Sequence, residues 1–244
     1  MSLPKLTVMK HKMTLPSTGE SITFRPFLVK EEKLLMVAMQ SGEQDDMVRA
    51  LKEIIGNCVE KDLNLDSLPM FDIEYIFLQL RARSVGDEVP ITYSEDDKQC
   101  EKNIPCVFET VVKIDDIKIE KSEGHKDLVD ITDKIKVKMK YPAMEMANKL
   151  QGIEQDDLVD STFKMITACI EYIMDGEQMH KTSDYTEAEV NEFLNSLSSL
   201  QFKGIQQFFD SAPKLKKEVT STCKHCGKQD TKVLEGLADF FVSG

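Results

Sequence analysis

Four of the six cysteines in this sequence have the spacing expected of metal ligands. Cys223 and Cys226 are separated by two residues and are followed by Gly227. Two thiolates at this spacing can chelate one tetrahedral ion, and a glycine after the second thiolate lets the backbone turn tightly. A redox pair of the same spacing normally opens a helix after a strand, which this glycine-containing turn does not indicate. The motif therefore predicts one half of a structural zinc site.

The other half of the predicted site is the pair Cys100 and Cys106. Its spacing is wider than usual, and Pro105 stands where a glycine turn would be expected. We expect one Zn²⁺ ion held by four ligands: Cys100, Cys106, Cys223 and Cys226. Two alternatives stay open, namely that His225 replaces one cysteine or that the chain binds no metal. Four protein ligands leave no position for water, so this zinc would be structural.

The other candidates for chemistry have simpler explanations. Cys58 and Cys169 fall at helical spacing among apolar residues, so we expect both thiols in the core. The paired carboxylates at 45–46 and 156–157 could hold a divalent ion, but the dipole at a helix N-terminus also favours acidic residues. The sequence has no glycine-rich phosphate loop, His-Glu-x-x-His motif or nucleophile elbow. We therefore predict no catalytic residues and no enzymatic activity.

An internal repeat connects the two cysteine pairs. The segment Glu43–Glu60 recurs 111 residues later as Glu154–Glu171, with 8 of 18 positions identical. A short extended segment precedes each copy, and one cysteine pair follows each copy. These features predict a duplication in which a pseudo-twofold axis brings the two pairs together. The alternative is two unrelated helices that share an acidic N-terminus.

The elements that must position the first pair read as a strand, three helices and β structure. Alternation and aromatic residues predict a strand over 21–29, and apolar spacing predicts helices over 30–41, 44–60 and 69–84. Gly42 is expected to end the first of these helices. Residues 88–121 are expected to form β structure around Cys100 and Cys106.

The second half of the chain is predicted to follow a similar plan. Residues 134–140 alternate lysine with apolar residues and predict a strand, whose lysines we interpret as protection of a sheet edge. Helices are expected over 142–150 and 155–174, followed by a loop over 175–184. Thr186 and Glu189 form a capping box that predicts another helix start. A second helical segment over 202–209 and a strand over 215–222 then lead to Cys223.

These elements predict an α+β fold that is predominantly helical, with internally duplicated helical halves joined by a bipartite zinc-ribbon-like β region. We divide the chain into an N-terminal arm over 1–20, a first half over 21–121 and a second half over 122–244. A length of 244 residues is enough for a sizeable core.

Composition restricts the kinds of partner. The net charge is −12, whereas a general nucleic-acid binder needs surplus Lys and Arg to displace counterions from phosphate. No apolar run is long enough to span a membrane, and residues 1–5 lack the apolar core of a signal peptide. We therefore expect a cytosolic protein with neither a nucleic-acid nor a membrane partner.

Three segments carry a family pattern: Ile22–Leu35, Arg81–Gly86 and the ending in which Cys223-x-x-Cys226-Gly227 precedes Leu234–Phe241. These segments resemble the baseplate hub subunit family of T-even-type contractile-tailed bacteriophages. The resemblance covers most of residues 20–242 and rests on overall pattern. It implies a non-enzymatic hub subunit or assembly factor that contacts other hub or tail proteins. It also implies assembly in the host cytoplasm, with a place in the virion tail as one outcome.

A second function hypothesis comes from the cysteines themselves. A zinc ribbon is also used by regulators that act on nucleic acid or RNA polymerase. The acidic balance and the lack of a basic stripe interleaved with aromatic residues count against that alternative. The oligomeric state cannot be deduced from the sequence.

Overall fold

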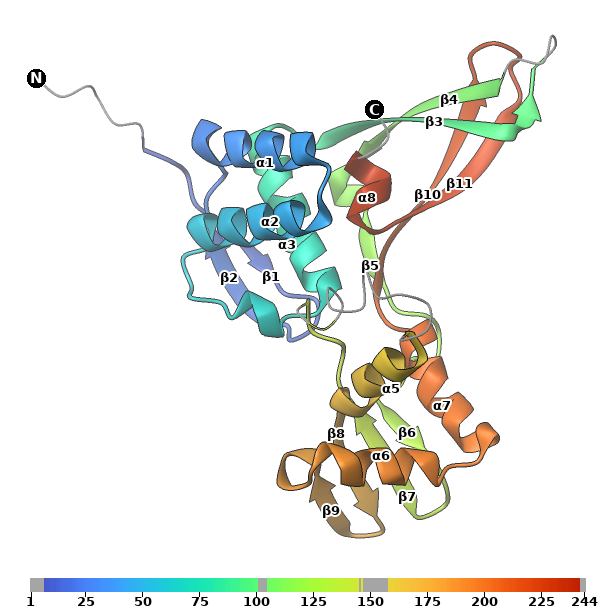
Figure 1. Ribbon diagram of the computed structural model, residues 1–244. Helices are drawn as coiled ribbons and strands as arrows, with labels where there is room; N and C mark the ends of the chain where they lie inside the picture. The colour runs from blue at the N-terminus through green and yellow to red at the C-terminus, as the bar shows by residue number, and fades with distance from the viewer. Residues whose placement is uncertain (1–6, 101–104, 145, 147–157, 242–244) are drawn as a thin grey trace, which may run out of the picture. The chain divides into compact units, whose positions relative to one another are not determined.

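The computed structural model describes residues 7–100, 105–144, 146 and 158–241 (Figure 1). The chain divides into two compact units. The first comprises residues 1–65, 71–120 and 214–244, and the second comprises residues 66–70 and 121–213. The C-terminal segment therefore returns to the unit that the N-terminal part of the chain begins.

The first unit combines a helical part with two sheets. Strands β1 (His11–Thr14) and β2 (Ser21–Phe24) form an antiparallel hairpin. Helices α1 (Val29–Ser41), α2 (Gln44–Cys58) and α3 (Met70–Ser84) follow, close to the predicted bounds. Gly42 adopts a left-handed conformation with φ of 70° and ends α1, as predicted.

Most of the second sheet of this unit consists of two long hairpins. Their strands are β3 (Glu88–Gln99), β4 (Pro105–Lys113), β10 (Lys214–Cys223) and β11 (Gln229–Glu235). The order is β11-β10-β4-β3, and β5 (Lys118–Glu120) also pairs with β10. Helix α8 (Gly236–Phe241) closes the unit. One core cluster joins α3, the inner face of this sheet and α8 through buried residues that include Leu78, Phe108 and Phe240.

The second unit combines a four-stranded antiparallel sheet with helices. Its strands are β6 (Leu128–Asp130), β7 (Ile135–Met139), β8 (Ile170–Asp175) and β9 (Gln178–Lys181), in that spatial order. Helices α5 (Leu158–Ala168), α6 (Glu187–Asn195) and α7 (Ser199–Asp210) supply the other half of its core. The predicted capping box of Thr186 and Glu189 begins α6.

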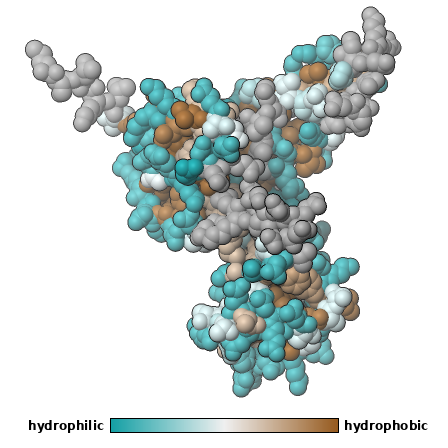
Figure 2. Space-filling view, viewed as in Figure 1, coloured by the Kyte–Doolittle hydropathy of each residue, from teal (hydrophilic) through white to brown (hydrophobic). Residues whose placement is uncertain are grey.

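In Figure 2, hydrophilic side chains cover much of the visible surface, with patches of hydrophobic residues over α1 and α2.

The fold is therefore a mixed one, because the described residues form three antiparallel sheets as well as the helices. The prediction of a predominantly helical fold, made of two duplicated halves joined by a zinc-ribbon-like region, is wrong. The helix expected over 155–174 ends at Ala168, and β8 begins at Ile170. Gly176 and Glu177 form the turn of a β8–β9 hairpin in a region expected to be a loop, with Gly176 at φ of 61°.

The lysine-rich strand also lies in a different place from the one expected. Strand β7 runs between β6 and β8, so it is not an edge strand. Its outward lysines form ion pairs with the neighbouring strand and the residues before it, Lys136 with Asp130 at 2.9 Å and Lys138 with Asp127 at 2.6 Å. The lysines therefore serve cross-strand pairing on a solvated face.

A local similarity remains at the two core cysteines. The Cys58 carbonyl accepts a hydrogen bond from the Arg25 N–H at 2.9 Å, and the Cys169 carbonyl accepts one from the Lys140 N–H at 2.8 Å. Each buried cysteine is either the last residue of a helix or the residue directly after one. The residue that follows the cysteine then pairs with a strand that lies earlier in the chain. Arg25 and Lys140 are 115 residues apart, so the strands do not keep the offset of 111 seen in the sequence repeat.

Candidate metal centre

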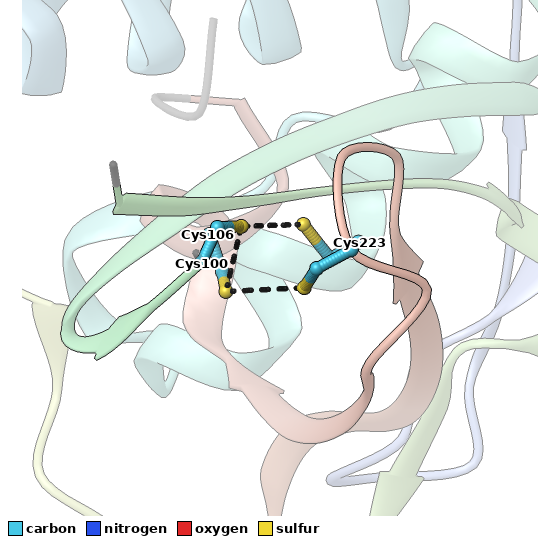
Figure 3. A group of neighbouring side chains, drawn as sticks. Cys100, Cys106 and Cys223 are labelled. Carbon is cyan, nitrogen blue, oxygen red and sulfur yellow. Dashed lines mark hydrogen bonds between the residues drawn. The ribbon is translucent and has the colours of Figure 1, made fainter. Parts of the chain in front are cut away.

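The structure brings together the four cysteines that the sequence predicts as ligands. Cys100 directly follows β3, Cys106 lies in β4, Cys223 ends β10 and Cys226 lies in the turn before β11. All four sulfur atoms lie within 4.8 Å of one another. The measured pairs are Cys100–Cys106 at 3.4 Å, Cys100–Cys223 at 3.6 Å and Cys106–Cys226 at 3.8 Å (Figure 3).

The turn after Cys223 is fixed by backbone hydrogen bonds. The Gly227 N–H donates to the Cys223 carbonyl at 2.9 Å, and the Cys223 N–H donates to the Lys228 carbonyl at 2.8 Å. Gly227 has φ of 72°, a conformation that L side chains rarely adopt. The turn also directs the His225 N–H at the Cys223 sulfur, at 3.4 Å. The glycine thus does what the sequence motif predicts, because it lets the backbone fold around the thiol.

Strand pairing brings the second cysteine pair to this turn. Cys223 pairs with Phe108 and Thr222 with Glu109 across β10 and β4. Just beyond, the Lys224 N–H donates to the Val107 carbonyl at 3.4 Å, and the Lys224 ammonium contacts the Glu109 carboxylate at 2.5 Å. The sequence analysis missed these supporting contacts, because they depend on a register between segments more than 100 residues apart.

The cysteine cluster is shielded from solvent. Cys106 and Cys223 are buried, with 0% and 2% of their surfaces exposed, Cys100 is buried at 8%, and Cys226 is half-buried. Tyr93 stacks on Phe108 with ring centroids 5.1 Å apart, next to Cys223 in the sheet. Aromatic and aliphatic side chains therefore form the wall of the site, which excludes water from any bound ion.

The pKa values of Cys100 and Cys106 are shifted in the opposite direction from that of Cys223. Burial raises the pKa of the Cys100 and Cys106 thiols. Burial would also raise the pKa of Cys223, but the backbone N–H groups of His225 and Cys226 outweigh it and lower the pKa to about 6. The turn thus stabilises a thiolate, the form of cysteine that binds metal.

The cluster fits a tetrahedral zinc ion. Zn–S bonds of about 2.3 Å in tetrahedral geometry place the sulfurs about 3.8 Å apart. The three measured sulfur separations, 3.4 to 3.8 Å, are close to this value. Four thiol donors with no carboxylate or imidazole among them are typical of a closed structural zinc site.

The other candidate residues lie outside the cluster. Among the described residues, the side chains close enough together to hold one metal ion are those of the four cysteines, and His225 is not one of them. Cys58 and Cys169 are buried elsewhere, and burial raises their thiol pKa values to about 11 and about 12. Asp46 pairs with Arg49 at 2.8 Å near the start of α2. The Asp45 side chain and the pair at 156–157 fall outside what the structure describes.

No described helix is long and apolar enough to cross a membrane. No solved structure matches the chain. The chain is 25% identical over 234 residues to the "Baseplate hub assembly protein gp26" of Enterobacteria phage T4, and the match covers 95% of this chain and 98% of that relative. The family described as "T4 bacteriophage base plate protein" matches residues 8–242, which include all four clustered cysteines. This protein therefore belongs to the T4 bacteriophage base plate protein family.

Proposed function

We propose that this protein is a non-enzymatic assembly factor or subunit of a contractile-tail baseplate hub. The observation that carries the proposal is the family match over residues 8–242, together with the near full-length similarity to a hub assembly protein. Such a protein acts by contacts with other hub or tail proteins. We place these contacts in the host cytoplasm during assembly, with retention in the virion tail as one outcome.

The structural zinc is the second part of the proposal. One Zn²⁺ ion held by Cys100, Cys106, Cys223 and Cys226 would fasten the β3–β4 hairpin to the turn between β10 and β11. The sulfur separations and the N–H groups directed at Cys223 support this assignment. Because four protein ligands leave no position for substrate or activated water, the ion would stabilise the fold and take no part in catalysis.

The pocket lining and the buried polar groups of the described residues are compatible with a non-enzymatic role. One pocket of the second unit is lined by lysines, hydroxyl groups and apolar side chains, and no set of nucleophile, base and oxyanion donors converges there. The one buried serine-hydroxyl without a partner among the described residues, Ser221, lies on the same strand as Cys223 and faces the core. These observations favour a protein that works through binding.

The proposal can be tested in the phage that encodes this chain. Deleting the coding sequence should abolish complete baseplates in electron micrographs of infected-cell lysates, and expression of the wild-type chain in the host should restore them. Complete baseplates without the chain would contradict the proposal. Salt-dependent retention of the purified protein on DNA at physiological ionic strength would instead favour the zinc-ribbon regulator.

A further inference from the structure

Strand β11 borders the sheet that carries the cysteine cluster, and part of its backbone is not used within that sheet. Among the described residues, β11 pairs with β10 alone. The Cys223 N–H donates to the Lys228 carbonyl at 2.8 Å, which makes these residues a hydrogen-bonded pair of the antiparallel ladder. Hydrogen-bonded pairs alternate with non-hydrogen-bonded pairs. The N–H and C=O groups of Gln229, Thr231 and Val233 therefore point outward from the sheet edge.

The free part of this edge has defined ends. The Glu235 N–H also points outward, but it donates to the Asp239 carboxylate at 2.8 Å and is already used. At the other end the chain leaves the sheet in the turn that contains Gly227. The free edge therefore comprises residues 229–233, with Thr231 at its midpoint. Val233 is 50% exposed, so the solvated face beside the edge is open as well.

The opposite edge of the same sheet is blocked. The Ile114 N–H donates to the Asp87 carbonyl at 2.7 Å, and the same alternation along β3 directs the backbone nitrogens of Pro90 and Thr92 outward. Proline has no N–H to offer, and proline within an edge strand prevents the pairing of a further strand. Strand β11 contains no proline. The sheet is therefore closed to strand addition at β3 and open to it at β11.

The open edge is electrically neutral in a strongly acidic chain. The net charge of the chain is −12, whereas the charged residues within 229–233 are Asp230 and Lys232, whose charges cancel. Tyr93 orders both side chains, because its hydroxyl donates to Asp230 Oδ2 at 3.2 Å and its ring centroid lies 4.8 Å from Lys232 Nζ. One acidic and one basic side chain thus stand on the same face of the sheet, one on each side of Thr231.

We propose that the β11 edge pairs with the β11 edge of a second copy of this chain, antiparallel and centred on Thr231. In this register residues 229–233 pair along their whole length, and the outward N–H and C=O groups of the two strands meet. Asp230 lies opposite Lys232 of the second copy. The twofold axis repeats that pair, so the dimer contains two opposite-charge pairs. This inference goes beyond the hub function and does not depend on it.

Charge selects this register over its neighbours. Pairing centred on Lys232 places two lysines directly opposite each other, and pairing centred on Asp230 does the same with two aspartates. Pairing centred on Val233 places Lys232 opposite Leu234 and extends to Glu235, whose N–H is already used. The midpoint of the free edge and the charge pattern thus indicate the same axis. This agreement favours a second copy over an extended strand of another protein, because the strand itself supplies the complementary charges.

Sedimentation equilibrium of the full chain tests for the dimer. Two short strands make a small interface, so we expect a weak dimer with a Kd of about 10 to 100 µM. At about 0.15 M salt, raising the protein concentration from about 2 µM to about 300 µM should raise the average mass from near 27.7 kDa toward twice that value. A mass that stays at the monomer value throughout this range would overturn the proposal.

Charge exchange then locates the axis. Asp230→Lys brings like charges together in both cross-strand pairs, and so does Lys232→Asp, so each variant should dimerise about tenfold more weakly than the wild type. An equimolar mixture of the two variants should regain wild-type association, because each lysine of one copy then faces an aspartate of the other. Circular dichroism establishes that each variant is folded. A mixture that associates as weakly as the separate variants, or single variants that associate like the wild type, would overturn the proposed interface.

A pair of proline variants tests the edge without changing its charge. Val233→Pro removes an outward N–H that β10 does not use, so the variant should keep its circular dichroism spectrum while its dimer weakens about tenfold or more. The matched control Thr92→Pro removes an outward N–H from the blocked β3 edge and should associate like the wild type. Equal association of the two proline variants would overturn the assignment to β11. A monomeric wild type whose Val233→Pro variant fails to restore baseplates would also overturn it, and would indicate a strand of another protein as the occupant.

Discussion

The sulfur atoms of Cys100 and Cys223 lie 3.6 Å apart although 123 residues separate them in the chain. Cys100 lies at the turn end of the β3–β4 hairpin and Cys223 at the turn end of the β10–β11 hairpin, and the residues between them include 121–213, which make up most of the second unit. Closing a connection of this length costs conformational entropy that grows slowly with its length. A bound ion would offset that cost at the point where the chain returns to its first unit.

The first prediction concerns metal content. The purified protein, prepared without chelator, should contain one zinc per chain, and Cys223→Ser should lose the ion, because Cys223 supplies the thiol whose pKa the turn lowers to about 6. Elemental analysis measures both. The matched control is Cys58→Ala, which should keep the zinc and lose on the order of 1 kcal/mol of stability through poorer core packing. Native protein without zinc, or metal loss in Cys58→Ala, would contradict the assignment.

Much of this site could be predicted because its signals are local. The Cys-x-x-Cys-Gly spacing specifies the turn, and Gly227 has the positive φ that the motif requires. The partner pair Cys100 and Cys106 was inferred from the sequence repeat, and the four thiols do meet. The sheet that brings them together was not predictable in the same way, since the register of Cys223 against Phe108 is set by packing between distant segments.

The fold was predicted well where periodicity is strong and poorly where neighbouring strands decide the structure. Helices α1 to α3 and the start of α6 follow their capping and apolar spacing. The segment after Ala168 continues a helical pattern, yet it pairs with β7 as a strand. Tertiary pairing outweighed local propensity there, and Gly176, the first residue of the two-residue turn, was the local signal that would have revealed the hairpin.

The second prediction uses two glycines that differ in backbone conformation. Gly227→Ala should destabilise the protein by about 1 to 2 kcal/mol and weaken zinc retention, because alanine is strained at φ of 72°. Gly56→Ala should instead stabilise by about 0.5 to 1 kcal/mol, since Gly56 is exposed within α2 and has nothing within 4 Å of an added Cβ. Urea unfolding of the two variants provides the comparison. If the two substitutions changed the free energy of unfolding equally, the left-handed conformation of Gly227 would not be what disfavours alanine at that position.

The third prediction concerns acid stability. Glu31 is fully buried and accepts hydrogen bonds from Arg25 and from the Leu28 N–H, each at 2.9 Å. Burial raises the pKa of the Glu31 carboxyl, but these hydrogen bonds outweigh burial and lower the pKa to about 2. A carboxyl whose pKa is lower in the folded state stabilises the protein above its unfolded pKa of about 4.3. This stabilisation should disappear as the pH falls from about 4.3 to about 2.

Glu31→Gln tests this dependence. The variant should lose about 2 to 4 kcal/mol at pH 7, because Arg25 keeps its charge in a largely buried site without its carboxylate partner. Its free energy of unfolding should also fall less than that of the wild type between pH 5 and pH 3. The neighbouring Glu32→Gln, on the less buried side of α1, serves as the control and should behave like the wild type. Parallel pH profiles for wild type and Glu31→Gln would rule out this role for the ion pair.

The last prediction concerns how α8 is attached to α3. The Leu237 N–H donates to Glu74 Oε1 at 3.2 Å, so a side chain from α3 caps the first turn of α8. Gly236, at φ of 73°, starts this helix, and an added Cβ would lie 3.2 Å from the same Glu74 oxygen. Gly236→Ala should therefore cost about 1 to 2 kcal/mol through backbone strain and crowding of the cap. Hydrogen exchange at the buried Phe240 amide should quicken, because α8 would open more often.

A double-mutant cycle distinguishes crowding from strain at this position. Glu74→Ala removes the cap and also the oxygen that a new Cβ would meet. If crowding contributes, Gly236→Ala should cost less in the Glu74→Ala background than in the wild type, with a coupling energy of about 0.5 kcal/mol or more. If backbone strain alone acts, the two costs should add. Exchange rates at Phe240 that stay at the wild-type value in both single variants would show that Glu74 does not hold α8 in place.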